Sequence, residues 1–129
     1  TRRGGPLPTV ETVIDATIRL LLVDDEARVR QGLRMCMAGE PDFDVVGEAE
    51  EGGAAVGLAA ELSPDVVVLD LRMRGLGGIE AARALADLQP SARVVVLSLQ
   101  DDANTRREAI ASGATAFVGK QEGIARLFE

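Results

Sequence analysis

From residue 18 onward, short apolar runs alternate with stretches in which apolar residues recur at helical spacing. The runs are mostly rich in β-branched residues and bounded by polar or turn-forming residues, a pattern typical of strands. They predict strands over residues 18–23, 43–46, 66–69, 94–97 and 116–118. A regular alternation of strand and helix predicts a parallel sheet with helices on both faces, which is an α/β doubly wound fold.

The stretches between these runs place apolar residues three and four positions apart, as on one face of a helix. Three predicted helices have apolar faces made of Val29, Leu33, Cys36 and Met37; of Ala55, Ala59 and Leu62; and of Ala81, Leu85 and Leu88. Gly, Pro or Ser follows each helix, where a stop is expected. Strands buried on both faces read as continuous apolar runs, so residues 20–23, 66–69 and 94–97 should be central. The second run alternates apolar and polar residues, which favours an edge strand.

A polar residue directly follows four of the runs: Asp24, Asp70, Ser98 and Lys120. Parallel strands in register would bring these residues out at one level on the carboxyl edge of the sheet. Open α/β sheets bind ligands along this edge, at the point where the strand order reverses. The sequence therefore predicts a binding site built from these residues.

Three carboxylates, those of Asp24, Asp25 and Asp70, would crowd one end of this site and repel each other unless cations neutralise them. A divalent cation together with Lys120 would balance their charge, and oxygen ligands of this kind suit Mg²⁺. A metal beside a carboxylate, an ammonium and a hydroxyl is suited to phosphoryl transfer. We therefore expect Asp70 to be the nucleophile, with Lys120 and Ser98 holding phosphoryl oxygens.

Composition narrows the possible functions. The 129 residues fit a single domain and include no His, which excludes Ser-His-Asp and Cys-His catalysis and any phosphohistidine formed on the chain itself. A phosphoryl donor must therefore be another molecule. The net charge of −7 makes the chain a poor binder of nucleic acid or anionic membranes. No apolar run approaches membrane-spanning length, and the single Cys36 suits a reducing compartment, so we expect a cytoplasmic protein.

Four motifs in order resemble the receiver domain of bacterial response regulators, especially the NarL/FixJ type with a LuxR-type output. They are Leu-Leu-Val-Asp24-Asp25-Glu26, Val-Val-Val-Leu-Asp70-Leu-Arg-Met, Val-Leu-Ser98 and Gly113-Ala-Thr-Ala-Phe117-Val-Gly-Lys120. The resemblance covers residues 18–129 and implies a flavodoxin-like (CheY-like) sheet in the strand order 2-1-3-4-5. Residues 1–17, with two Gly and two Pro among basic residues, are expected to be a flexible extension, native or added.

The resemblance also implies roles for individual residues. Asp25 and Asp70 would bind Mg²⁺ directly, Asp24 would bind it through water, and the backbone carbonyl of Arg72 would complete the protein ligands. Asp70 would receive the phosphoryl group from a sensor histidine kinase, while Ser98 and Lys120 would hold its oxygens and Phe117 would be the aromatic rotamer switch.

Signalling would then pass through a face formed by the helix at residues 102–112, the Phe117 strand and the final helix. Ile110 is the only large apolar residue expected to anchor that first helix, so the helix should shift at low cost. The resemblance implies homodimerisation on activation and a DNA-binding output domain that lies outside this chain.

Three positions depart from the receiver pattern. Arg74 replaces a usual Pro, Gly77 stands where Asp is common, and Leu99 follows Ser98 where a small residue is preferred. These changes affect expected phosphorylation rates more than the chemistry.

Three other functions remain open. One is a degenerate receiver that binds partners without phosphorylation, and another is a phosphotransferase with an aspartyl nucleophile. Such enzymes commonly have an acid two residues after the nucleophile, where this chain has Arg72. A flavin-binding electron carrier would need aromatic stacking partners, but the chain has three Phe, no Tyr and no Trp. We expect a signalling domain that catalyses only its own phosphorylation and dephosphorylation.

Overall fold

The computed structural model describes residues 17–71, 77–98 and 103–119. Helices and strands alternate along the chain: β1 (Ile18–Val23), α2 (Ala27–Ala38), β2 (Phe43–Ala49), α3 (Gly52–Leu62), β3 (Val66–Leu69), α4 (Gly78–Leu88), β4 (Arg93–Ser98), α5 (Ala103–Ala111) and β5 (Ala116–Gly119). All five predicted strands are confirmed, although β2 continues past the predicted end at residue 46. The predicted extension at residues 1–17 lies almost entirely outside the described residues.

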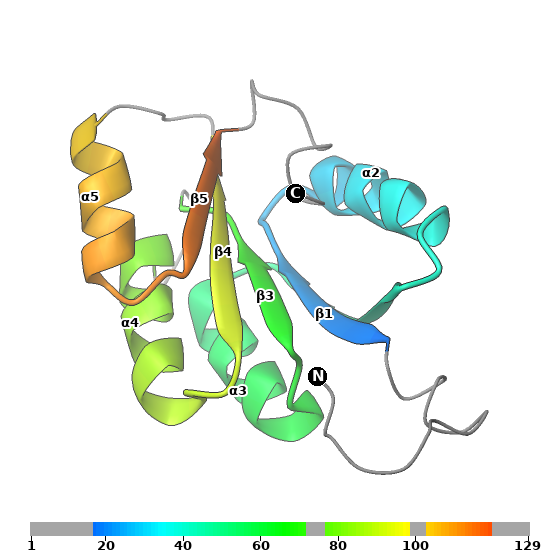
Figure 1. Ribbon diagram of the computed structural model, residues 1–129, viewed down its shortest axis with the longest axis horizontal. Coiled ribbons are helices and arrows are strands. Elements are labelled where there is room, and N and C mark those ends of the chain that lie inside the picture. The colour runs from blue at the N-terminus through cyan, green and yellow to red at the C-terminus, as the bar shows by residue number, and fades with distance from the viewer. Residues whose placement is uncertain (1–16, 72–76, 99–102, 120–129) are drawn as a thin grey trace, which may run out of the picture.

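The strands form one parallel sheet in the order β2-β1-β3-β4-β5. This confirms the predicted doubly wound fold, and β2 lies at an edge as its alternating pattern indicated. Helix α2 covers one face of the sheet, while α3, α4 and α5 lie on the other (Figure 1). The order reverses at β1 and β3, so the carboxyl ends of these two strands form the crevice where such folds bind ligands.

Two clusters of buried side chains form the core, one on each face of the sheet. Leu22, Leu33 and Val68 belong to the cluster beneath α2. On the other face the helices contribute mainly alanines, whose small side chains allow the helices to lie close to the Val and Leu side chains of the strands. The core thus fixes the strand ends that carry the candidate site.

Parts of the predicted apolar helix faces are exposed. Leu33 and Met37 are buried as expected, but Cys36 is exposed because it lies about 100° around the helix from Met37. Leu88 is 64% exposed at the last position of α4, where the helix end leaves its side chain uncovered. The prediction that Ile110 anchors its helix is also wrong: Ile110 is 50% exposed, and the buried residues of α5 are Thr105 and Ala109.

None of the helices formed by the described residues is long and apolar enough to cross a membrane.

Candidate functional site

Asp24 and Asp70 leave adjacent strands at the same level. In the pairing of β1 with β3, Val23 lies opposite Leu69, so the next residue on each strand is an aspartate. The backbone N–H of Asp70 donates to the Val23 carbonyl (2.9 Å), and that of Asp24 donates to the Ala49 carbonyl (3.1 Å). These hydrogen bonds fix the backbone beneath both carboxylates.

The carboxylates of Asp24, Asp25 and Asp70 meet at this edge. Each offers one oxygen, and these oxygens lie within 4.8 Å of one another. Asp24 and Asp70 are buried, with 2% and 6% of their surface exposed, whereas Asp25 is partly exposed. The predicted convergence of the three acids is therefore confirmed. Carboxylate oxygens are the ligands that a hard divalent cation such as Mg²⁺ prefers. The partly exposed Asp25 leaves the group open to solvent, which suits an ion that keeps some of its water.

Ser98 lies on a different level from the acids. Leu69 pairs with Val96, so Ser98 is one residue beyond the level of Asp70. Ser98 in turn pairs with Gly119 on β5. The prediction that Ser98 emerges at the level of Asp24 and Asp70 is wrong, because Val66 on β3 pairs with Arg93 rather than with Val94. The fourth residue of that prediction, Lys120, lies outside the described residues. Ser98 is nevertheless buried at the carboxyl end of β4, next to β3.

Phe117 belongs to the buried cluster beneath α3, α4 and α5, with 6% of its surface exposed. It lies two residues before Gly119, the partner of Ser98 in the sheet. Side chains two residues apart in a strand face the same side, so Phe117 and Ser98 occupy diagonal positions on one face. This placement is compatible with a coupling between the two side chains.

Two predicted site residues, Lys120 and Arg72, lie outside the described residues, as do Arg74 and Leu99. Gly77, the remaining departure from the receiver pattern, is the N-cap of α4.

Gly78, which was not among the predicted site residues, lies directly against the backbone of Asp70 and Leu71. Its backbone N–H donates to the Leu71 carbonyl (3.2 Å). A Cβ at this position would lie 2.4 Å from the Leu71 Cα and 2.6 Å from the Asp70 carbonyl oxygen. Only glycine therefore allows α4 to begin so close to the backbone of Asp70. The adjacent pair Gly77-Gly78 was the available signal.

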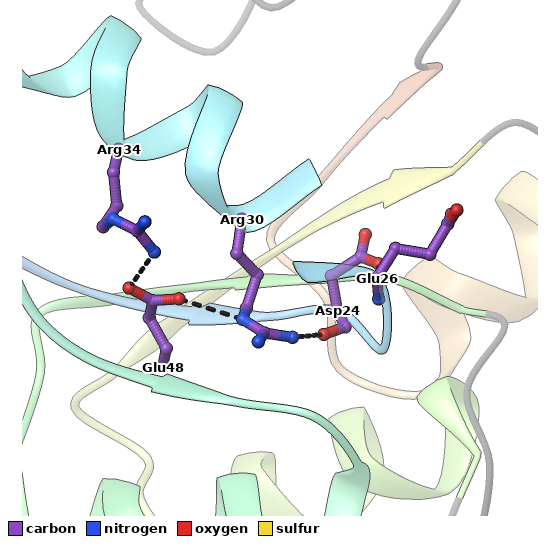
Figure 2. A network of polar contacts seen from close by, with 5 residues as sticks. All are labelled: Asp24, Glu26, Arg30, Arg34 and Glu48. Carbon is purple, nitrogen blue, oxygen red and sulfur yellow. Dashed lines mark hydrogen bonds and ion pairs between the residues drawn. The ribbon is translucent and has the colours of Figure 1, made fainter. Parts of the chain in front are cut away.

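A polar network of Arg30, Arg34 and Glu48, also absent from the predicted site, reaches the backbone of Asp24. Arg30 on α2 contacts both Asp24 and Glu48, and Arg34 contacts the other oxygen of Glu48 (Figure 2). The signal was an acidic residue, Glu48, within the otherwise apolar end of β2, opposite a helix with arginines one turn apart.

The family model described as the response regulator receiver domain matches residues 20–129. The chain therefore belongs to the receiver domain family of two-component response regulators. Its similarities place it with the NarL/FixJ type. LiaR of Bacillus subtilis (strain 168), a transcriptional regulatory protein, is 38% identical over 110 residues, which cover 85% of this chain and 52% of LiaR.

Solved structures agree with this assignment. A LuxR-family two-component response regulator from Aurantimonas sp. SI85-9A1 superposes with a TM-score of 0.83 at 37% identity, covering 87% of this chain and 80% of that chain. The signal receiver domain of the response regulator NarL from Mycobacterium tuberculosis gives a TM-score of 0.77 at 33% identity, covering 81% and 84%.

The match is to one module of longer proteins. The chain spans about half the length of transcriptional relatives such as LiaR. It is also 40% identical over 110 residues to a protein-glutamate methylesterase/protein-glutamine glutaminase of Thermotoga maritima, covering 84% of this chain and 32% of that protein. The chain is thus similar to parts of proteins with different names, a transcriptional regulatory protein and a methylesterase/glutaminase.

Proposed function

We propose that this receiver accepts a phosphoryl group on Asp70 and responds to it as a switch. The observation that carries the proposal is the meeting of the Asp24, Asp25 and Asp70 carboxylates at the strand-order reversal. Three acids in one place favour a cation, and a buried acid beside a cation is suited to act as the nucleophile in phosphoryl transfer. Because the chain has no His, the phosphoryl donor is a separate molecule, and membership of the receiver family favours a sensor histidine kinase as that donor.

In this reaction a carboxylate oxygen of Asp70 attacks the phosphorus atom of the kinase phosphohistidine. The new O–P bond forms as the P–N bond breaks, and the imidazole nitrogen leaves with the electron pair and takes up a proton. Bound Mg²⁺ would supply positive charge beside the phosphoryl oxygens, with Asp25, Asp70 and the Arg72 carbonyl as its direct ligands and Asp24 bound through water. Ser98 and Lys120 would hold the remaining oxygens.

The proposed response is a shift of α5 and β5, coupled to the Ser98 hydroxyl and the Phe117 ring. A phosphoryl group adds charge and strong acceptors that attract a nearby hydroxyl. Helix α5 buries only Thr105 and Ala109, so moving it exposes little apolar surface. Ile110, exposed on the same helix, gives this face an apolar residue suited to a partner or to homodimer formation.

We place the domain boundary near residue 18 and the output outside this chain. The transcriptional relatives favour a DNA-binding output. The receiver chain itself, with a net charge of −7, is unsuited to bind DNA, so DNA contact would belong to that output. Such a regulator would act in the cytoplasm, in keeping with the single unpaired Cys36.

Intact mass spectrometry tests the proposal. After incubation with acetyl phosphate and Mg²⁺, the chain should gain the mass of a single phosphoryl group, and a chelator should prevent the gain. Asp70→Asn should abolish the adduct, whereas Asp44→Asn, at an exposed position on β2, should retain it. A folded wild-type chain that gains no mass would favour a degenerate receiver. Catalytic turnover of phosphate esters would favour a phosphotransferase.

A further inference from the structure

Arg30 joins three elements at the base of the acidic site. Its side chain extends from the first turn of α2 toward the end of β1 (Figure 2). There Nη1 donates to the backbone carbonyl of Asp24, while Nε donates to Oε1 of Glu48 on β2 (2.9 Å). The Arg30 side chain is only 12% exposed. A single guanidinium thus connects α2, β2 and the turn that carries Asp24 and Asp25.

Glu48 holds that guanidinium in place through one carboxylate oxygen, while its other oxygen contacts a second arginine. Arg30 binds Oε1, and Arg34, one helical turn further along α2, binds Oε2. The Glu48 side chain is 26% exposed and that of Arg34 is 44% exposed. The more buried pair, Arg30 with Glu48, is therefore also the one that reaches the site.

A register shift in the sheet directs Glu48 toward α2. Leu20 pairs with Val45, but Leu21 pairs with Gly47, so Val46 is skipped. Glu48 consequently lies opposite Leu22, whose side chain packs on the α2 face. Without the extra residue Glu48 would pair with Val23 and face the other side of the sheet, because a one-residue slip reverses every side chain. Irregularities of this kind often re-aim a side chain beside a functional site.

These contacts restrain Asp24 from several directions. Its N–H donates to the Ala49 carbonyl, its carbonyl accepts from Arg30, and its Oδ1 accepts from the Glu26 N–H (2.9 Å). The position of the turn thus depends on Arg30.

We propose that Arg30, held by Glu48, is a positioning residue that arranges the turn at Asp24 and Asp25 for a divalent cation. The inference rests on the proposed function, because it assumes that these acids bind the metal. Partners that orient metal ligands typically change metal affinity by about 10–100-fold when removed. The fork of the guanidinium is essential to this role, since one group must reach the Asp24 carbonyl and the Glu48 carboxylate together.

Titration of the 129-residue chain with Mg²⁺ alone, followed by calorimetry or by amide NMR shifts, tests this role. We expect Arg30→Met to weaken Mg²⁺ binding by about tenfold or more. Arg30→Lys keeps the charge but loses the fork, so its affinity should fall nearly as far. Arg34→Met is the matched control on the same helix, and its affinity should stay within about twofold because exposed ion pairs contribute little.

Wild-type affinity in Arg30→Met would overturn the inference. So would an Arg30→Lys variant that binds like the wild type, because the double contact of the guanidinium would then be unnecessary. A wild-type chain that binds no Mg²⁺ would instead contradict the proposed metal site.

A second measurement requires no metal. The Glu26 amide hydrogen bonds to Asp24, so its hydrogen exchange reports how well the turn is held. We expect faster exchange at Glu26 in Arg30→Met and in Glu48→Gln, but not in Arg34→Met. Unchanged exchange in the first two variants would overturn the positioning role even if Mg²⁺ binding failed. Glu48→Gln also serves as the test variant if Arg30→Met does not fold, as judged by circular dichroism.

Discussion

The guanidinium carbon of Arg106 on α5 lies 4.7 Å from the centroid of the Phe117 ring on β5. One face of the buried ring is therefore covered by a cation from the helix that we propose to shift on phosphorylation. A guanidinium over an aromatic face is attracted by the electron density of the ring. The contact links α5 to the Phe117 side chain in the unphosphorylated protein.

Removing this cation should loosen α5. We expect Arg106→Gln to lower the free energy of unfolding by about 0.5–1 kcal/mol, measured by urea denaturation, and to increase hydrogen exchange in α5. Arg107→Gln is the control, because Arg107 is exposed and its side chain contacts Asn104 at 3.5 Å. Equal effects of the two substitutions would show that the contact with Phe117 contributes nothing.

Gly78→Ala should disturb the site directly. The added Cβ would meet backbone atoms of Asp70 and Leu71, which cannot move without displacing the chain beside the proposed nucleophile. We expect a loss of stability of about 1–3 kcal/mol in urea denaturation and slower phosphorylation by acetyl phosphate.

The matched control is Gly57→Ala, in the middle of α3, where a Cβ would meet nothing within 4 Å. That substitution should raise stability by about 0.5–1 kcal/mol, since alanine is favoured over glycine within a helix. A Gly78→Ala variant as stable and as rapidly phosphorylated as the wild type would contradict the tight packing of Gly78 against the backbone of Asp70 and Leu71.

Two leucines on α4 should respond very differently to truncation. Leu85 is fully buried in the core, whereas Leu88 is 64% exposed. Leu85→Ala should lower the free energy of unfolding by about 2–5 kcal/mol, because it removes buried apolar surface and leaves a cavity. Leu88→Ala should change it by less than about 0.5 kcal/mol in the same urea denaturation experiment. A large loss from Leu88→Ala would mean that this side chain is covered in solution.

The sequence predicted the fold well because strands buried on both faces leave a clear pattern. The apolar runs ending before Asp24 and Asp70 located two central strands, and equal positions in those runs do lie side by side. That is why the meeting of the acids could be foreseen. Exposed residues such as Cys36 and Leu88 were misplaced because helical spacing shows which residues share a face, but not how far that face is covered.

Register beyond the first pair of strands could not be read in the same way. Ser98 follows its run as Asp70 does, yet lies one residue further along the sheet, because hydrogen bonding between strands, and not the length of an apolar run, determines pairing. The roles of Arg30 and Glu48 were hidden for a similar reason. Their contact depends on the residue skipped between Val45 and Gly47, which no sequence pattern marks.

The most direct measurement locates the phosphoryl group on the chain. After incubation with acetyl phosphate and Mg²⁺, borohydride reduction converts an aspartyl phosphate to homoserine, which peptide mass spectrometry identifies by position. We expect homoserine at position 70 alone, and none when Mg²⁺ is omitted. Homoserine at position 24 or 25, or a phosphate ester on Ser98 in its place, would contradict the assignment of Asp70 as the phosphoacceptor.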